Sequence, residues 1–403
     1  MPDIYLARQP IYDSSLNVYA YELLFRDNEQ NRAGVIDGDE ATSNVIVNTF
    51  MEIGLNNIVD DRLAFINLTR SFIVNAKQIS LPRDRVVLEL LEDIAPDEEV
   101  IAGMQRLSRQ GYQIALDDFV LHETVRPLIE LADIIKIDVM ALSDQQIRNH
   151  VEELRRYPVK LLAEKVESWE MYDMCKALNF DFYQGYYFSL PKIIQKKSLP
   201  TNRLSILTLL GQLQDPDIAT KDLEDIIAKD VALSYRMLNY VNSAALGLAR
   251  KVDSIHEAII LVGLQNIRSW ATLIAMSMVD DKPVELVNTA MIRGRMCERL
   301  AQILDQSNPK SFFTVGLFSA LDALMDTSMD AILTQLPLAE HIADALVEHN
   351  GIHGQILTCV LDYERGEWNN MNHDLPHIPE IHKVYLDALM WASQMRAQMI
   401  QHN

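Results

Sequence analysis

Short apolar runs alternate with segments of helical spacing over the first half of the chain. Segments such as 98–110 and 168–178 repeat apolar residues every three or four positions, as amphipathic helices do. Between such segments lie seven runs with the length and composition of buried strands: residues 19–26, 63–69, 86–92, 113–119, 134–138, 160–167 and 180–188. This alternation predicts a parallel sheet, and the close succession of units favours a (β/α)8-type barrel.

The second half has a different pattern, which is helical throughout. Leu204, Leu207 and Leu210 fall on one helix face, and the segment 254–257 has the sequence of a capping box before an apolar run. The run 196–200, KKSLP, has the composition of a linker. We therefore predict two domains, a barrel over residues 1–195 and an all-α domain over residues 196–403.

Each predicted strand carries a polar residue that is costly to bury. These residues are Glu22, Asn67, Glu89, Asp118, Lys136, Glu164 and Gln184. In a barrel the carboxyl ends of the strands meet at one mouth, so we expect a pocket rich in carboxylates, with Lys136 as its main cation. Such a cluster needs either raised pKa values or divalent cations. Oxygen ligands without His or Cys favour Mg²⁺ or Mn²⁺ over zinc.

The composition and net charge of the chain limit the classes of partner that it is expected to bind. Asp and Glu outnumber Lys and Arg 57 to 36, and the net charge of -21 argues against binding of a nucleic acid polymer or an anionic membrane surface. The three cysteines lie far apart, which fits a reducing compartment. No signal-peptide pattern or long apolar run is present, so a cytoplasmic protein is expected.

Seven motifs follow one another in the first half. They are ELLFR at 22–26, preceded by Gln9 and Pro10, FINLT around Asn67, ELLE at 89–92, DDF at 117–119, KID at 136–138, AEKVE at 163–167 and QGY at 184–186. In this order they resemble the motifs of EAL-domain proteins, which hydrolyse the bacterial messenger cyclic di-GMP to linear pGpG. The resemblance spans residues 1 to about 192 and implies a cyclic di-GMP phosphodiesterase.

The same resemblance implies two metal sites per barrel, for Mg²⁺ or Mn²⁺. One would be held by Glu22, Asn67, Glu89 and Asp117, and the other by Asp117, Asp118 and Glu164. A metal pair of this kind polarises a phosphodiester and lowers the pKa of a shared water.

Further roles follow from the matching positions. Lys136 would hold the attacking water or offset charge, and Glu164 and Glu167 would also belong to the catalytic set. Three residues are expected to contact the substrate, namely Gln9, Arg26 and Gln184, with Arg26 as a two-pronged phosphate donor. Glu92 would support the loop after the DDF motif.

Two departures from the family pattern concern the mouth of the barrel. The segment 120–125 reads VLHETV where a glycine-rich loop is usual, and Lys165 stands where glycine is usual. They leave two functions besides an active enzyme: a receptor that binds cyclic di-GMP without cleaving it, and a scaffold that acts through protein contacts.

The helical half resembles an HDOD module, a relative of HD-domain phosphohydrolases that generally lacks their metal ligands. The similarity rests on segments 230–244, 254–263 and 316–324, and Ser319 and Ala320 stand where an HD enzyme has its His-Asp pair. This resemblance implies a non-catalytic module that regulates the barrel or binds a protein partner, in a chain that could form a homodimer.

Several residues have simpler interpretations when taken alone. Glu22 and Arg26 could form an ordinary salt bridge, and only the ordered set of motifs outweighs that reading. His349 and His353 have a metal-ligand spacing, but Gly351 between them favours ordinary surface histidines. The His373-Asp374 pair lies among prolines and is expected in a loop.

Overall fold

The computed structural model describes residues 4–27, 54–74, 81–92, 94–117, 125–185, 201–215, 217–243, 251–279, 282–336, 338–368 and 381–400. The chain divides into two compact units, Met1–Tyr187 with Glu364–Gly366, and Phe188–Tyr363 with Glu367–Asn403. The predicted boundary at residue 195 falls outside the described residues, so its position stays a prediction.

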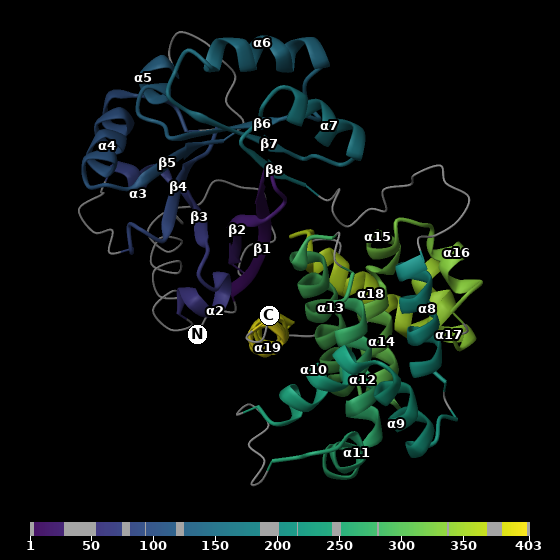
Figure 1. Cartoon of the computed structure of the whole chain (residues 1–403). Helices are drawn as coiled ribbons and strands as arrows, with labels where there is room; N and C mark the ends of the chain where they lie inside the picture. The colour runs from purple at the N-terminus through teal and green to yellow at the C-terminus, as the bar shows by residue number, and fades with distance from the viewer. Residues whose placement is uncertain are drawn as a thin grey trace. The chain divides into compact units, whose positions relative to one another are not determined.

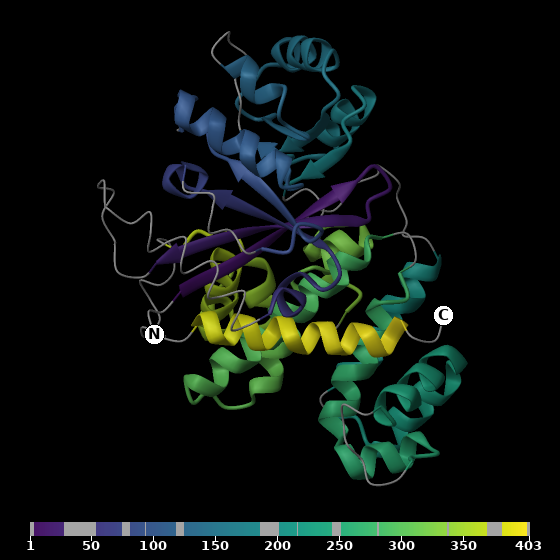
Figure 2. The same ribbon diagram turned by 90° about the vertical axis from the view of Figure 1, so that its left-hand side faces the viewer.

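The first unit is a closed barrel of eight strands in chain order, which confirms the predicted architecture (Figure 1). The strands are β1 (Ile4–Asp13), β2 (Val18–Asp27), β3 (Leu63–Leu68), β4 (Val86–Leu90), β5 (Gln113–Leu116), β6 (Ile134–Asp138), β7 (Lys160–Glu164) and β8 (Phe182–Gln184). The helices described between them are α2 (Leu55–Val59), α3 (Arg70–Val74), α4 (Glu98–Arg109), α5 (Arg126–Ile129), α6 (Asp144–Leu154) and α7 (Trp169–Ala177). Figures 1 and 2 show α4 to α7 outside the strands that they connect.

The expectation of a wholly parallel sheet is wrong for one strand. β1 was not predicted, and it runs antiparallel to both of its neighbours, β2 and β8. A tight turn joins β1 to β2, in which Asp13 Oδ1 accepts hydrogen bonds from the backbone N–H groups of Ser15 and Asn17, at 2.8 and 2.9 Å. A turn this short can only join antiparallel strands, whereas a parallel pair needs a crossover.

Local sequence explains where the barrel helices begin. Asp97 caps α4 by accepting a hydrogen bond from the N–H of Val100, at 2.9 Å. Acidic residues occupy the first turn of α4 and arginines its last turn, as the helix dipole favours. Ser168 caps α7 in the same way, through the N–H of Met171. These caps fix the points at which the chain leaves the barrel mouth.

The second unit is helical in all its described elements. They are α8 (Thr201–Leu213), α9 (Thr220–Lys229), α10 (Val231–Val241), α11 (Ile255–Val262), α12 (Leu264–Met276), α13 (Val284–Ile303), α14 (Pro309–Phe318), α15 (Leu321–Met325), α16 (Met329–Leu333), α17 (Glu340–Val347), α18 (Gly351–Glu364) and α19 (Ile381–Ile400). The long helices α13 and α19 pack together, and Figure 2 shows α19 as one continuous rod.

The predicted cap at the start of α11 is present in a modified form. Ser254 Oγ accepts from the N–H of Glu257 at 3.1 Å, while the Glu257 carboxylate accepts from the N–H of Asp253 rather than Ser254. No helix in the described parts of the chain is long and apolar enough to cross a membrane.

Candidate metal centre in the barrel

A ring of polar residues lies directly above an apolar layer inside the barrel. The apolar layer takes one residue from each strand, namely Ile11, Ala20, Phe65, Val87, Ala115, Ile134, Leu162 and Phe182. Two positions further along, toward the carboxyl end of each parallel strand, lie Asn67, Glu89, Asp117, Lys136, Glu164 and Gln184. Side chains two positions apart share a face of a strand, so these residues also point inward.

The first two strands complete the same ring. Glu22 lies two positions after Ala20 on β2, and it pairs across the sheet with Gln9 on β1. Gln9 precedes the apolar residue Ile11 instead of following it, because β1 runs in the opposite direction. Eight strands therefore contribute eight polar positions to one end of the barrel.

Lys136 lies at the centre of four carboxylates. Its Nζ is 2.5 Å from Glu164 Oε1, 3.1 Å from Asp117 Oδ1 and 3.4 Å from Glu22 Oε2. It also contacts Glu89 Oε1, and its side chain is only 1% exposed. One ammonium group thus faces four carboxylates in a water-poor interior, so these charges are not balanced when all are ionised.

Burial and neighbouring charges shift the pKa values of three residues of the ring. Burial raises the pKa of Glu89 to about 8, against the attraction of Lys136 and with the help of Glu22 and Asp117. Burial also raises the pKa of Glu164 well above its ordinary value. Burial acts to lower the pKa of Lys136, but the surrounding carboxylates outweigh it and raise this pKa. The ammonium of Lys136 therefore stays charged, while Glu89 and Glu164 resist ionisation.

The oxygens of the ring fit a divalent cation. Glu89, Asp117 and Glu164 each offer a carboxylate oxygen, and these three atoms lie within 4.8 Å of one another. Among the described residues, Asn67 Oδ1, Glu89 Oε2 and Gln184 Oε1 are buried without a hydrogen-bond partner. Buried oxygens normally have a partner, so oxygens left over in an acidic ring fit a hard cation such as Mg²⁺ or Mn²⁺.

Gln184, on β8, links the ring to residues of β1 and β2. Its Nε2 donates to Gln9 Oε1 at 2.9 Å and to Glu22 Oε2 at 2.6 Å. The following residue, Gly185, has φ +154°, and a Cβ there would lie 2.1 Å from the carbonyl oxygen of Val166. Glycine is therefore required after Gln184, where the chain passes against the backbone that follows β7.

Not all of the predicted site residues join this ring. Glu92 and Glu167 are exposed, and neither contacts Lys136. Asp118, the loop 118–124 and the side chain of Arg26 lie outside the described residues. Their assigned roles stay predictions.

One feature of the mouth was missed from the sequence. Lys165 has φ +53°, and its Nζ lies 2.5 Å from Asp138 Oδ2. The register of β6 and β7 would have indicated this contact, because Asp138 pairs across the sheet with Glu164, the residue before Lys165. The residue that replaces the usual glycine thus adds an ion pair at the rim.

The histidine prediction for the helical unit is wrong for one residue. His349 is exposed, as predicted. His353 instead stacks on Phe312, with ring centroids 3.7 Å apart, and its Nε2 lies 2.8 Å from Ser311 Oγ. Gly351 opens helix α18 rather than interrupting it, so His353 faces the neighbouring helix α14. The His373-Asp374 pair lies outside the described residues.

At the position where the resemblance places the His-Asp pair of an HD enzyme, a serine hydroxyl contacts an arginine. Ser319 Oγ accepts from Arg293 at 3.3 Å and donates to the carbonyl of Gly316 at 2.8 Å. Within the described part of this unit, no three His, Cys, Asp or Glu side chains come together as metal ligands would.

Fold and site together define a barrel with an acidic, metal-type mouth, followed by a helical module. Comparison with known families agrees: the EAL domain family matches residues 50–191, and the HDOD domain family matches residues 199–336. The chain belongs to the proteins that join an EAL domain to an HDOD domain.

Two full-length relatives support this assignment. Uncharacterized protein YuxH of Bacillus subtilis (strain 168) is 31% identical, over 97% of this chain and 98% of the relative. Cyclic di-GMP phosphodiesterase CdgJ of Vibrio cholerae serotype O1 is also 31% identical, over 97% of this chain and 93% of the relative.

Solved structures of EAL proteins are also similar to the first half. An EAL domain protein from Listeria monocytogenes EGD-e covers 46% of this chain and 87% of its own, with 18% identity and a TM-score of 0.37. The Klebsiella pneumoniae protein BlrP1, in a complex with calcium and cyclic di-GMP, covers 46% and 54%, with 18% identity and a TM-score of 0.38.

Proposed function

We propose that the barrel hydrolyses cyclic di-GMP to linear pGpG with the help of two divalent cations, Mg²⁺ or Mn²⁺. The observation that carries this proposal is the set of oxygens from Glu89, Asp117 and Glu164 within 4.8 Å of one another. The EAL family match supports it, as does the full-length similarity to a protein named as a cyclic di-GMP phosphodiesterase.

In this proposal the metals are held by the oxygens of the ring and by the neighbouring DDF motif. Glu22, Asn67, Glu89 and Asp117 would hold one ion, and Asp117, Asp118 and Glu164 the other. When bound, such ions polarise a phosphodiester and lower the pKa of a coordinated water.

The remaining residues of the mouth would position the substrate. Lys136 holds the attacking water or offsets the charge that develops on the phosphate. Gln9 and Gln184, which already bond to each other, contact the nucleotide, and Arg26 pairs with a phosphate oxygen. Glu167 joins the catalytic set from the exposed segment after β7, and Glu92 supports the loop 118–124.

We further infer that residues 196–403 form a non-catalytic module that regulates the barrel of residues 1–195 or binds a protein partner. In the helical unit, Ser319 takes the position of an HD metal ligand and bonds to Arg293 instead. The chain would act in the cytoplasm, with a homodimer as its assembled form.

The test is turnover by the full-length chain. Purified protein with Mn²⁺ and cyclic di-GMP should release pGpG, and Glu22→Ala should release none above background. Glu170→Gln removes one acidic charge from the exposed surface of helix α7 and should keep wild-type activity. Calorimetry with the same nucleotide separates the alternatives. Tight binding without turnover would replace the enzyme with a receptor, and neither binding nor turnover would reject both.

A further inference from the structure

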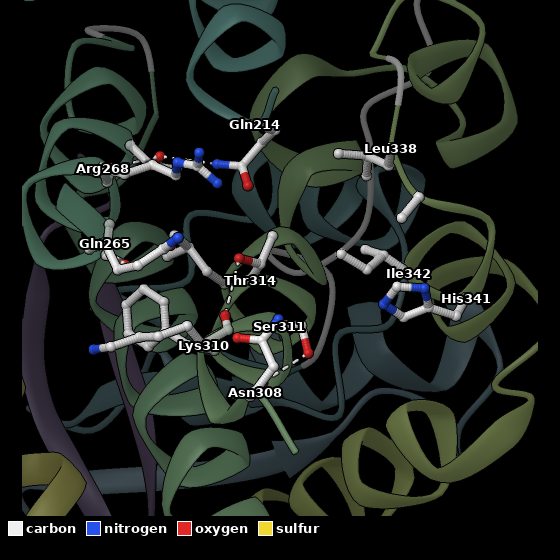
Figure 3. A pocket seen from close by; sticks show the side chains of 15 residues that line it. Gln214, Gln265, Arg268, Asn308, Lys310, Ser311, Thr314, Leu338, His341 and Ile342 are labelled. Carbon is white, nitrogen blue, oxygen red and sulfur yellow. Dashed lines mark hydrogen bonds between the residues drawn. The ribbon is translucent and has the colours of Figure 1, made fainter. Parts of the chain in front are cut away.

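The helical unit contains a cavity of about 230 Å³ that the proposed reaction does not use. Gln214, just after α8, lines it together with residues of α12, of α14 and the preceding Asn308, and of the segment 338–342 that leads into α17 (Figure 3). Figure 3 shows Arg268 and Gln214 pointing toward one another at one end, with Leu338 and Ile342 on the opposite wall. The lining therefore combines a charged end with an apolar side.

The charges at this cavity are positive. Arg268 and Lys310 line it, and none of the lining residues is Asp or Glu. Lys310 is partly compensated, since its Nζ lies 2.8 Å from Glu298. Arg268 donates to the backbone carbonyl of Asp215 at 2.8 Å, while its buried Nε has no hydrogen-bond partner among the described residues. The guanidinium thus retains donor capacity.

Burial of Arg268 disfavours its charged form. It lowers the pKa of the guanidinium, against the attraction of the Asp215 carboxylate. A cation that loses hydration without gaining a carboxylate partner favours an incoming anion.

The hydroxyl groups around the cavity already donate to their own helices. Thr272 donates to the Arg268 carbonyl at 2.9 Å, Ser269 to the Gln265 carbonyl at 3.0 Å, and Thr314 to the Lys310 carbonyl at 3.2 Å. Donors for a ligand must therefore come from the two cations and from side-chain amides. Because the available groups are mainly donors, the cavity favours a ligand whose polar end accepts hydrogen bonds.

The opposite wall and the volume limit the rest of the ligand. Phe313, Leu317, Leu338 and Ile342 offer apolar surface to the cavity. Ligand pockets usually measure about 300–1,000 Å³, so this cavity of about 230 Å³ is smaller than most. It suits a ligand up to the size of a mononucleotide and not a macromolecule.

We propose that this cavity binds a small organic anion, with its phosphate or carboxylate group at Arg268 and Lys310 and its less polar part against Leu338 and Ile342. The site lies within the helical unit and is separate from the ring around Lys136. The HDOD domain would then respond to a small molecule that it binds itself.

The test is calorimetry on the full-length chain in EDTA, with inorganic phosphate, guanosine 5′-monophosphate, citrate and neutral guanosine as probes. Saturable binding of at least one anion, and none of guanosine, is expected. A comparison of the affinities for guanosine 5′-monophosphate and citrate then shows whether the site prefers a phosphate or a carboxylate. Arg268→Gln should weaken binding at least tenfold, and Lys310→Gln should weaken it less.

Two further variants keep the test decisive. Leu338→Trp fills the cavity without changing any charge and should also abolish binding, even if Arg268→Gln fails to fold. Lys221→Gln removes an exposed lysine that does not line the cavity and should leave the affinity unchanged. No anion binding by the wild type, or binding that survives both Arg268→Gln and Leu338→Trp, would overturn the proposal.

Discussion

Replacing Lys136 by methionine should destabilise the metal-free barrel more than any other loss of a lysine at its mouth. The ammonium lies between 2.5 and 3.4 Å from oxygens of Glu164, Asp117 and Glu22 and also contacts Glu89. At an effective dielectric constant of about 20, each of these carboxylates that is ionised attracts the ammonium from about 3 Å by roughly 5 kcal/mol. Burying the ammonium itself costs several kcal/mol, which offsets part of this gain.

The net loss is therefore expected at about 3–5 kcal/mol, the usual cost of leaving buried charges without their partner. Saturating Mn²⁺ should restore part of it, since a ligand at 100 times its Kd adds about 2.7 kcal/mol. Lys165→Met is the matched control. Its side chain is 53% exposed, so its loss should cost less than about 1 kcal/mol.

Hydrogen exchange of the full-length chain, read by mass spectrometry, separates the two units. Peptides from β4 to β7 should lose protection in Lys136→Met with EDTA, while peptides from α13 stay unchanged. A loss below about 1 kcal/mol, or one equal to that of Lys165→Met, would refute the argument that one buried ammonium holds the four carboxylates together.

Three further predictions test other parts of the structure. Gly185→Ala places a Cβ 2.1 Å from the Val166 carbonyl and should cost more than about 2 kcal/mol in urea unfolding, whereas Gly111→Ala, also at positive φ but with open space, should cost only about 1. Burial lowers the pKa of His353 from 6.5 to about 4, so the unfolded chain binds more protons than the folded chain between these pH values. The stability of the folded chain should therefore fall as the pH drops from 6.5 to about 4. His353→Gln should flatten this pH dependence, read from the hydrogen exchange of α18 peptides. Lys165 has φ +53°, so Lys165→Gly should be more stable than Lys165→Ala by about 1 kcal/mol, although both lose the ion pair; equal stabilities would argue against backbone strain there.

Much of the barrel could be predicted because its strands have a strict period of two. Phe65 and Asn67, or Ile134 and Lys136, show the same step from an apolar to a polar inward position on different strands. That repeated step places the polar residues in one layer once a closed barrel is assumed. β1 lacked this signal, because in an antiparallel strand the polar Gln9 precedes its apolar partner.

Contacts that depend on packing between separate elements could not be predicted in this way. His353 meets Phe312 and Ser311 because α18 packs beside α14, and spacing along one helix carries no such information. Arg268 becomes part of a cavity only through the arrangement of several helices. The ion pair between Lys165 and Asp138 likewise follows from strand register rather than from either residue alone.

The most direct test of the central claim is anomalous scattering from a crystal of the protein soaked in Mn²⁺. The account predicts a peak inside the barrel mouth, about 2.1 Å from oxygens of Glu89 and of Asp117 or Glu164. A soaked crystal with no peak in the ring, or with manganese bound only outside it, would contradict the account.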